Sequence, residues 1–565
     1  MKNNAFWIIL QRLRTPLLVI IFTYSISILG MVLIPGADND GNVYHLSFFD
    51  AFYFISYTAS TIGFGETPFD FTYDQRLWVL VCIYLTVVGW FYAIGTLVTV
   101  LSDKTLKYEL MRGKFRKQVK ALKSNFVIVL GYNYINSQVI KKLLENNIAV
   151  VLIDSSEDKI NMFQLEEFAQ SIPIMIADAL LSETLKDAGI EKENCQAVVS
   201  HFFKEDKNLR IAVFTKFLNP NVKVVTKATN RDILTSLVDT DIAKVENPFE
   251  IFAKRLDIAL TAPHIMILEN WIYKNHDLTH EATFLPQGRY IICGYGRMGK
   301  AIKEKLDYHS IDYVIIDENI FPNKEMIEND TFIYSNADDS AVLLDAGIEE
   351  ASVLIVGTQN DIDNISIIIT AQKLNPNLYI IARENTMKEV SVFEAADIDW
   401  LFMIERILIN RTSLQLAYPL RHAFLKLILD KNEEWGTSLV NLLKSQIGAN
   451  PKLMNLTITE NRAYALYHEI KSGKHISIDV LLKSLRDWKN YHTAIPLLLK
   501  RGEEKKLLPH GEILELDDQI LFACDEESRE EIEYIASNVY DLHYIRTGEE
   551  KKSWFLEKLF NWLKK

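Results

Sequence analysis

The chain has 565 residues, a formal net charge of −13 and 49% hydrophobic residues, and its length suits three or four domains. The acidic balance argues against a nucleic-acid-binding protein, whose surface needs clustered Lys and Arg. The four cysteines lie far apart, which argues against a disulfide framework or a paired-cysteine zinc site and favours reduced thiols.

Two apolar runs are long enough to cross a bilayer, for which about 20 residues are needed. Leu17 to Ile34 holds 18 residues without a charge, and Leu77 to Leu101 holds 25. We expect an outer transmembrane helix over 17–34 and an inner one over 77–101. The stretch from Phe6 to Arg14 predicts either an interfacial helix or the start of the first span.

The charges that flank these runs predict the orientation of the chain. From Lys104 to Lys123 there are eight basic residues and one acid, whereas the segment between the runs is acidic. Because basic segments stay on the cytoplasmic side, we expect a multi-pass protein of the cell (inner) membrane with both termini cytoplasmic. The acidic outer loop either raises the local cation concentration or is a solvated loop with no such role.

A short segment between the two runs predicts a helix that enters the membrane without crossing it. Ser47 is a typical N-cap, Asp50 suits the first turn, and this helix is expected over 47–58 with its cap included. About three turns cannot span the bilayer. Such a re-entrant helix is tolerated at membrane depth only when it is buried in protein. Its C-terminal end would present a partial negative charge, which favours cations.

The residues after this helix carry the most specific signal in the chain: Thr61, Ile62, Gly63, Phe64, Gly65 and then Glu66. Potassium filters read Thr-Val-Gly-Tyr-Gly, and their backbone carbonyls replace the hydration shell of the ion. Stacked carbonyls need alternating backbone conformations, and Gly63 and Gly65 take positive φ cheaply. The order span, pore helix, filter, span resembles the two-transmembrane potassium channels, which implies potassium as the permeant ion. Phe64 lacks the hydroxyl by which the usual Tyr ties this filter to its surroundings.

The second apolar run contains candidate gating residues. Gly89 and Gly95 are candidate hinges or close-packing positions, because glycine in a helix costs roughly 1 kcal/mol relative to Ala. The channel family has a hinge glycine in this region, and Gly89 aligns best with it. Leu97 and Leu101 lie near the cytoplasmic end, where a ring of apolar side chains could close the pore by dewetting. No arginine-rich span precedes the pore, so a voltage sensor is not expected.

The rest of the chain contains an internal repeat. The strand-like run that ends at Gly131 recurs at Gly294, and an Asp follows each glycine by 23 residues. The motif Asp-Ala-Gly-Ile-Glu occurs at 187–191 and at 345–349, and Leu-Asn-Pro-Asn occurs at 218–221 and at 374–377. The offsets of 163, 158 and 156 residues indicate a duplication with small insertions. Each copy alternates β-rich runs with helical patterns, as a doubly wound parallel sheet requires.

The second copy carries a whole dinucleotide fingerprint, which is a glycine-rich turn after the first strand and an acid after the second. Gly296 would let a pyrophosphate approach the helix N-terminus, and Asp317 would accept from a ribose hydroxyl, which favours NAD or ADP over NADP. Asp338 is a candidate for the far ribose or a metal-bridged phosphate, and Arg297 either pairs with phosphate or faces solvent. The candidate nucleotide-binding residues are Gly294, Tyr295, Gly296, Arg297, Met298, Gly299, Asp317 and Asp338.

The first copy keeps Gly131 but has Asn133 and Asn136 in place of the second and third glycines. Bulk at these positions obstructs the approach of a phosphate and the packing of the helix. We interpret the first copy as structural, or as selective for a different ligand.

A potassium pore joined to two such domains resembles the RCK (regulator of potassium conductance) channels. The resemblance implies a homotetramer whose eight Rossmann-like RCK domains form a cytoplasmic ring that pulls on the inner helices. We expect a pore domain (1–101), a basic linker (102–124), a first RCK domain with crossover helices over 248–273 (125–287), a second RCK domain (288–430), and an α+β C-terminal lobe with a basic tail (431–565). Within the lobe, Gly511 to Phe522 predicts a hairpin, and the tail either touches the membrane or packs on the ring.

The resemblance also bears on calcium. Some members bind Ca2+ through acids at positions that here hold Lys227, Thr229, Arg383 and Asn385. We therefore expect that calcium site to be missing, and calcium remains a candidate ligand without an assigned site.

The sequence predicts a potassium-selective channel, not an enzyme, that is gated by a cytoplasmic nucleotide such as NAD or ADP. Its expected partners are the lipid bilayer, further copies of itself and nucleotides, but not nucleic acid. The alternatives are a membrane-anchored dinucleotide-dependent oxidoreductase and a potassium transport regulator. The first has no substrate domain and no constellation for hydride transfer in this chain, and the second would lack its own pore.

Overall fold

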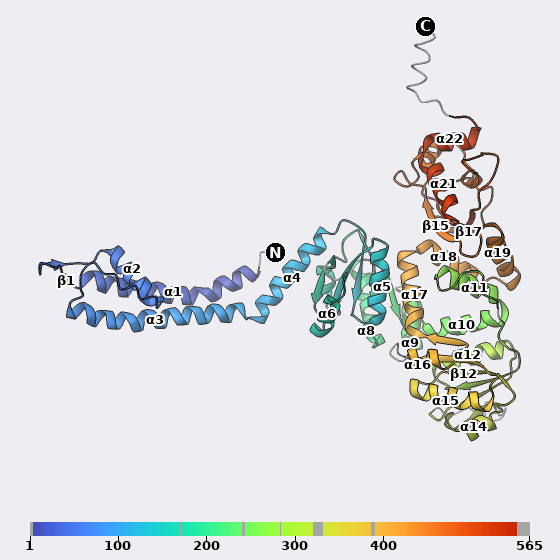
Figure 1. Cartoon of the computed structure of the whole chain (residues 1–565), viewed down its shortest axis with the longest axis horizontal. Helices are drawn as coiled ribbons and strands as arrows, with labels where there is room; N and C mark the ends of the chain where they lie inside the picture. The colour runs from blue at the N-terminus through green and yellow to red at the C-terminus, as the bar shows by residue number, and fades with distance from the viewer. Residues whose placement is uncertain are drawn as a thin grey trace, which may run out of the picture. The chain divides into compact units, whose positions relative to one another are not determined.

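The computed structural model describes residues 4–168, 171–239, 243–282, 284–319, 331–385 and 390–550 (Figure 1). The chain divides into two compact units. The first contains Met1–Lys123 together with Pro173–Met175 and Asp187–Gly189, and the second contains Ser124–Ile172, Ile176–Lys186 and Ile190–Lys565.

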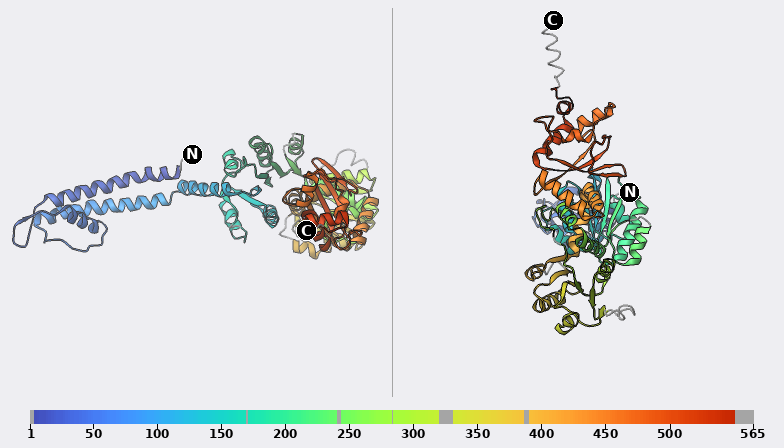
Figure 2. Two further views of the ribbon diagram at one scale, coloured as in Figure 1. Left: turned by 90° about the horizontal axis from the view of Figure 1, so that it is seen from above. Right: turned by 90° about the vertical axis from the view of Figure 1, so that its right-hand side faces the viewer.

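The first unit is helical and contains the two expected spans. Its elements are α1 (Asn4–Leu33), β1 (Gly36–Ala37), β2 (Val43–Tyr44), α2 (Phe48–Ala59), α3 (Tyr73–Leu101) and α4 (Lys104–Ala121). Figures 1 and 2 show α1 and α3 side by side. Apolar stretches over Leu13–Leu33 and Tyr73–Val100 are long enough to cross a membrane. The residues from Phe6 to Arg14 belong to the same helix as the first span. This stretch is therefore the start of the first span and not a separate interfacial helix.

Local sequence sets the ends of these helices. Ser47 caps α2 by accepting from the backbone N–H of Asp50, as expected. Thr72 and Gln75 form a reciprocal capping box at the start of α3, which places that start four residues before the expected Leu77. Asp103 caps α4 through its side chain, so only a two-residue break separates α4 from α3.

The soluble part contains two six-stranded parallel sheets of the same topology, which confirms the doubly wound fold. The first has the order β5-β4-β3-β6-β7-β8 and the second β11-β10-β9-β12-β13-β14. The strands of the first are β3 (Phe126–Leu130), β4 (Ala149–Asp154), β5 (Ile174–Ile176), β6 (Cys195–Ser200), β7 (Lys223–Lys227) and β8 (Lys244–Glu246). Those of the second are β9 (Arg289–Cys293), β10 (Tyr313–Ile316), β11 (Phe332–Ile333), β12 (Ala351–Val356), β13 (Tyr379–Glu384) and β14 (Trp400–Met403).

Helices connect the strands in both copies. The first copy has α5 (Tyr134–Glu145), α6 (Glu157–Gln164), α7 (Ser182–Asp187), α8 (Glu205–Leu218), α9 (Arg231–Asp239), α10 (Pro248–Thr261) and α11 (Pro263–Ile272). The second has α12 (Arg297–Tyr308), α14 (Ser340–Asp345), α15 (Asp361–Leu374), α16 (Val390–Ala395), α17 (Ile404–Ala417) and α18 (Pro419–Ile428). Helices α10 and α11 occupy the range 248–273 over which the helical crossover is expected.

The crossover helices exchange partners between the two copies. Helix α10 packs on α12 of the second copy, and its Phe249, Phe252 and Leu256 share a core with Tyr290 and Ile292. Helix α17 in turn packs on α5 of the first copy. Each sheet is thus completed by a helix from the other copy. The sequence ranges 125–287 and 288–430 remain a prediction for the domain boundaries.

The C-terminal lobe is α+β, as expected. It contains α19 (Glu433–Gln446), β15 (Lys452–Thr457), α20 (Tyr464–Lys471), η2 (Ile478–Leu482), β16 (Ile495–Arg501), β17 (Glu504–Leu507), β18 (Gln519–Cys524), α21 (Glu526–Ser537) and α22 (Val539–Thr547). The antiparallel sheet has the order β15-β18-β16-β17. The basic tail lies outside the described residues.

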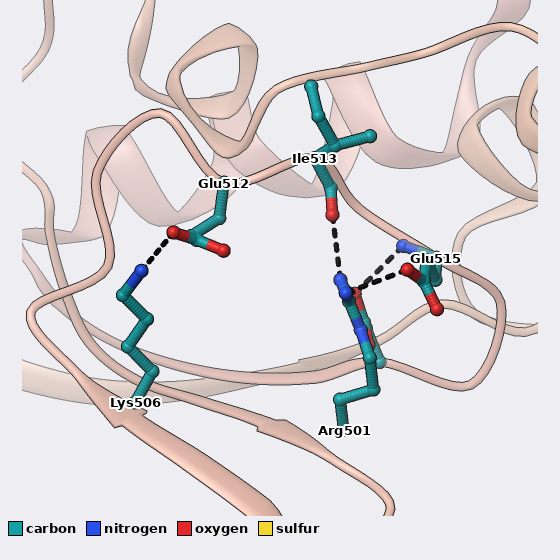
Figure 3. A network of polar contacts seen from close by, with 6 residues as sticks. Arg501, Lys506, Glu512, Ile513 and Glu515 are labelled. Atoms are coloured by element: carbon teal, nitrogen blue, oxygen red, sulfur yellow. Dashed lines mark hydrogen bonds and ion pairs between the residues drawn. The ribbon is translucent and has the colours of Figure 1, made fainter.

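The hairpin expected over Gly511–Phe522 is wrong, because β16 and β17 form the hairpin and β18 pairs with β15 and β16. Residues 511–518 form a turn that Arg501 holds from β16 (Figure 3). Its guanidinium donates to the carbonyl of Ile513 and to Glu515, each at 2.7 Å, and to the buried carboxylate of Asp518. The sequence pattern showed the turn residues but not the strand with which β18 would pair.

Candidate functional site

The loop after α2 has the backbone conformation that its two glycines predict. Gly63 has φ of 69° and Gly65 of 75°, both in the left-handed region. Thr61 also has positive φ, at 61°. The N–H groups of Ile62 and Gly63 donate to the carbonyl of Tyr57 at 3.0 and 3.3 Å, which joins the loop to the end of the helix.

Two tyrosines of α2 hold the far end of this loop. The hydroxyl of Tyr53 donates to the carboxylate of Glu66 at 3.0 Å, and that of Tyr57 donates to the carbonyl of Glu66 at 3.1 Å. The Phe64 ring meets Tyr57 edge-on, with 6.2 Å between centroids. The hydroxyls of Tyr53 and Tyr57 on the helix therefore make hydrogen bonds to this loop of the kind that Phe64 cannot make. Our sequence reasoning missed these tyrosines, although their four-residue spacing places both on one face of α2.

Helix α3 carries the other candidate pore residues. A Cβ on Gly89 would lie 3.0 Å from the Thr23 hydroxyl oxygen of α1, so Gly89 permits a close helix contact. A Cβ on Gly95 would meet nothing within 4 Å. Leu97 is exposed near the end of α3, and Leu101 is its last residue. Close packing thus explains Gly89, while the hinge and gate roles remain predictions.

The glycine-rich turn of the second copy leads into α12, and its Gly296 is half-buried with open space beside it. Gly294 directly follows β9 and has φ of 103°, and Gly296 occupies the N-cap of α12, where a Cβ would meet nothing within 4 Å. A Cβ on Gly299 would overlap the carbonyl oxygen of Gly294. Asp317, after β10, accepts from the N–H groups of Tyr295 and Asn319, each at 2.7 Å. This geometry matches the three glycine roles and the acid of a dinucleotide fingerprint.

A cleft of about 420 Å³ lies at this turn, where β9 meets β10 on one side and β12 on the other. In doubly wound sheets this switch point is where ligands bind. The cleft is lined by Gly294, Gly296, Arg297, Ile316, Asp317, Glu318, Asn319, Ser335, Asn336, Ala337, Gly357, Thr358, Gln359, Asn360, Asp363, Ile367 and Arg383.

Arg383 lines the cleft, although from the sequence we expected it only as a position of the missing calcium site. Its guanidinium carbon lies 5.1 Å from the centroid of the Phe249 ring, as does that of Arg297. The Nε atom of Arg383 is buried without a hydrogen-bond partner. Burial and the neighbouring Arg297 charge lower the pKa of Arg383 to about 10. Two cations therefore converge on the cleft, and one of them is poorly solvated.

The remaining candidate residues serve the fold around the cleft. Met298 is buried in the core behind the turn, and Tyr295 contacts Phe332 edge-on at 5.7 Å. The carboxylate of Asp338 accepts from the Ser366 hydroxyl and is not among the residues that line the cleft. The structure therefore brings Gly294, Gly296, Arg297, Gly299 and Asp317 together but leaves Asp338 outside.

The corresponding turn of the first copy is filled by side chains. Asn136 is fully buried and donates to the carbonyls of Leu130 and Gly131 at 3.2 and 2.6 Å. Asn133 donates to the carbonyl of His201 at 3.3 Å, and the Phe202 ring would lie 2.9 Å from a Cβ on Gly131. Burial lowers the pKa of His201 to about 3, so the imidazole is a neutral packing residue. These contacts support the structural interpretation of the first copy.

Comparisons with known proteins match both units. Residues 15–103 match the ion channel domain family, and residues 127–248 and 290–404 each match the TrkA-N domain family. "Potassium channel protein 1" of Methanocaldococcus jannaschii is 42% identical over 97 residues, which are 17% of this chain and 29% of that protein. "Probable potassium channel protein 2" of the same organism is 25% identical over 250 residues, which are 44% of this chain and 67% of that protein.

A solved structure of the GsuK channel bound to NAD aligns with a TM-score of 0.45 and 14% identity. The alignment covers 93% of this chain and 98% of that one. A structure of GsuK bound to ADP aligns with a TM-score of 0.44 and 18% identity, over 74% of this chain and all of that one.

Proposed function

We propose that this chain, a channel protein of the RCK-regulated two-transmembrane potassium type and not an enzyme, forms a potassium-selective pore controlled by a cytoplasmic nucleotide. The observation that carries the proposal is the joint presence of a filter-like loop between two spans and an open dinucleotide turn in the second copy.

The pore assignment rests on the loop from Thr61 to Gly65. Its glycines adopt positive φ, and its end is tied to the pore helix through Glu66. We assign Thr61, Ile62, Gly63, Phe64 and Gly65 as the selectivity filter, with potassium held by backbone carbonyls. A complete ring of such carbonyls needs four copies, so the active form is a homotetramer in the membrane with both termini cytoplasmic.

The ligand assignment rests on the cleft of the second copy. The N-terminus of α12, Arg297 and Arg383 together favour an anionic group, and Asp317, which lines the same cleft, would accept from a ribose hydroxyl. A nucleoside diphosphate unit, as in NAD or ADP, fits both requirements. A bound phosphate would also relieve the repulsion between the two guanidinium groups.

The nucleotide acts by its differential affinity for open and closed arrangements of the ring, which α4 transmits to α3. Calcium has no assigned site. Among the described residues no group of three or more His, Cys, Asp or Glu side chains is arranged to hold a metal ion.

Potassium flux in proteoliposomes tests the pore. We expect the wild type to release potassium passively and to pass little sodium, whereas Gly63→Ala should lose most of this flux because Ala is strained at φ of 69°. Gly41→Ala is a matched control, since Gly41 also has positive φ and nothing within 4 Å but lies in the outer loop. Wild-type vesicles without potassium flux would overturn the proposal, as would unchanged flux in Gly63→Ala.

A further inference from the structure

The duplicated motif Asp-Ala-Gly-Ile-Glu places one aspartate in two different environments. Asp187 ends α7 and Asp345 ends α14, and each is followed after one residue by a glycine with positive φ, 83° at Gly189 and 80° at Gly347. The backbone turn is therefore the same in both copies. Any difference between the two aspartates reflects what their side chains contact.

The Asp187 carboxylate is paired with two arginines of α4. The Nε of Arg112 donates to one of its oxygens, and the Nε of Arg116 lies 3.3 Å from the other. Its side chain is only 9% exposed. Arg112 and Arg116 are one helical turn apart, so they present both guanidinium groups on the same face of α4.

Asp345 is the aspartate of the same motif in the second copy. It is exposed to solvent, and within the described part of the chain it forms no ion pair. The turn therefore forms without an ion pair at its aspartate. A largely buried carboxylate that lies between two arginines is stabilised by them, and its loss removes the ion pairs that both arginines form with it.

We propose that Asp187, through Arg112 and Arg116, is the joint by which the first domain holds and moves the linker helix α4. Because only Ser102 and Asp103 separate α4 from α3, a displacement of Asp187 is passed to the end of the inner helix. Asp187 touches neither ligand nor permeant ion and is a positioning residue. The effect of this contact on gating rests on the proposed function, whereas the contact of Asp187 with the two arginines does not.

A double-mutant cycle on the open–closed equilibrium tests the joint. Full-length Asp187→Asn, Arg112→Gln, the double variant and the control Asp345→Asn are recorded in planar bilayers with potassium on both sides and no nucleotide. We expect each single joint variant to change the basal equilibrium constant by about fivefold or more, the double variant to add little to either, and Asp345→Asn to match wild type. Equal values for Asp187→Asn and Asp345→Asn would contradict the joint, as would additive effects in the double variant.

Limited trypsin digestion provides a readout that does not depend on conduction. The linker is rich in Lys and Arg, so a freed α4 should be cut several-fold faster in Asp187→Asn than in wild type or Asp345→Asn. Equal cutting rates in all three proteins would overturn the joint whatever the currents show. A wild type that carries no potassium current would instead overturn the proposed function, while the digestion still decides the joint.

Discussion

Arg383 shows how one side chain distinguishes the two copies. It lies near the end of β13, and its guanidinium group contacts the same Phe249 ring as that of Arg297. Its pKa is lowered because burial and the neighbouring like charge both oppose ionisation. The first copy has Lys227 at the equivalent strand end, next to a turn that Asn136 and Phe202 fill. We therefore expect an anion to bind in the second copy and to be obstructed in the first.

We expect Arg383→Gln to weaken binding of NAD or ADP by about 10- to 100-fold, because a charge-assisted contact to phosphate contributes roughly 1.5–3 kcal/mol. Isothermal titration calorimetry of the full-length channel in detergent measures the dissociation constant of the nucleotide. The matched control is Lys227→Gln, which should leave the affinity unchanged. Equal losses in the two variants would place the phosphate elsewhere.

The two tyrosines at Glu66 give a second prediction at this scale. We expect Tyr53→Phe to loosen the outer end of the filter and reduce the potassium-to-sodium permeability ratio several-fold, since Glu66 loses the 3.0 Å hydrogen bond from α2. Reversal potentials under bi-ionic conditions measure the ratio. Tyr73→Phe, at an exposed position that starts α3, is the control. Wild-type ratios in Tyr53→Phe would show that this tether is dispensable.

Glu384 predicts a pH dependence of stability. It is 2% exposed, both carboxylate oxygens are buried without partners, and burial with the charges of Asp361, Glu405 and Glu394 raises its pKa to about 7 despite Arg406. The folded state therefore holds this proton more tightly than the unfolded state. The resulting stabilisation is complete at acid pH and is lost as the pH rises through about 7.

We expect Glu384→Gln to remove this loss and to be the more stable protein at pH 8 by roughly 2 kcal/mol. Denaturant unfolding of the ligand-free channel at pH 6 and pH 8 checks it. Parallel changes of the two proteins between these pH values would contradict the assignment.

At the scale of elements, residue patterns that act locally predicted the structure well. Ser47 fixed the start of the pore helix, and the repeat of Gly131 and Gly294 with an Asp 23 residues later predicted two parallel sheets. Contacts between distant segments were not predictable in this way. Nothing in the spacing shows that α10 packs on α12, that Tyr53 reaches Glu66, or that β18 pairs with β15. Asp338 matched the pattern after the third strand, yet Ser366 from α15 binds its carboxylate.

The end of α3 carries a prediction about gating. We expect Leu97→Asp to raise the open probability at least several-fold, because four charged side chains would keep a constriction hydrated. Single-channel closed times measure this, with Leu80→Asp as a variant at an exposed position farther from the cytoplasmic end. Unchanged closed times in Leu97→Asp would place the gate elsewhere.

At the scale of the whole molecule, the exchange of crossover helices places Phe249 of the first copy beside the proposed ligand site of the second. Phe249 is the second residue of α10, and its ring centroid lies 5.1 Å from the guanidinium carbons of both Arg297 and Arg383. Helix α10 also packs on α12 of the second copy. Arg297 also donates to the Thr229 hydroxyl of the first copy. We expect a phosphate that engages Arg297 to compete with this contact, so that a ligand bound in the second copy would weaken the contact with Thr229.

The most direct test of nucleotide control is single-channel recording in a planar bilayer, with potassium on both sides and NAD added to the cytoplasmic face. We expect a change in open probability that Gly299→Val abolishes, because a side chain there overlaps the carbonyl of Gly294. Potassium currents that ignore both NAD and ADP, or a wild-type response in Gly299→Val, would contradict it.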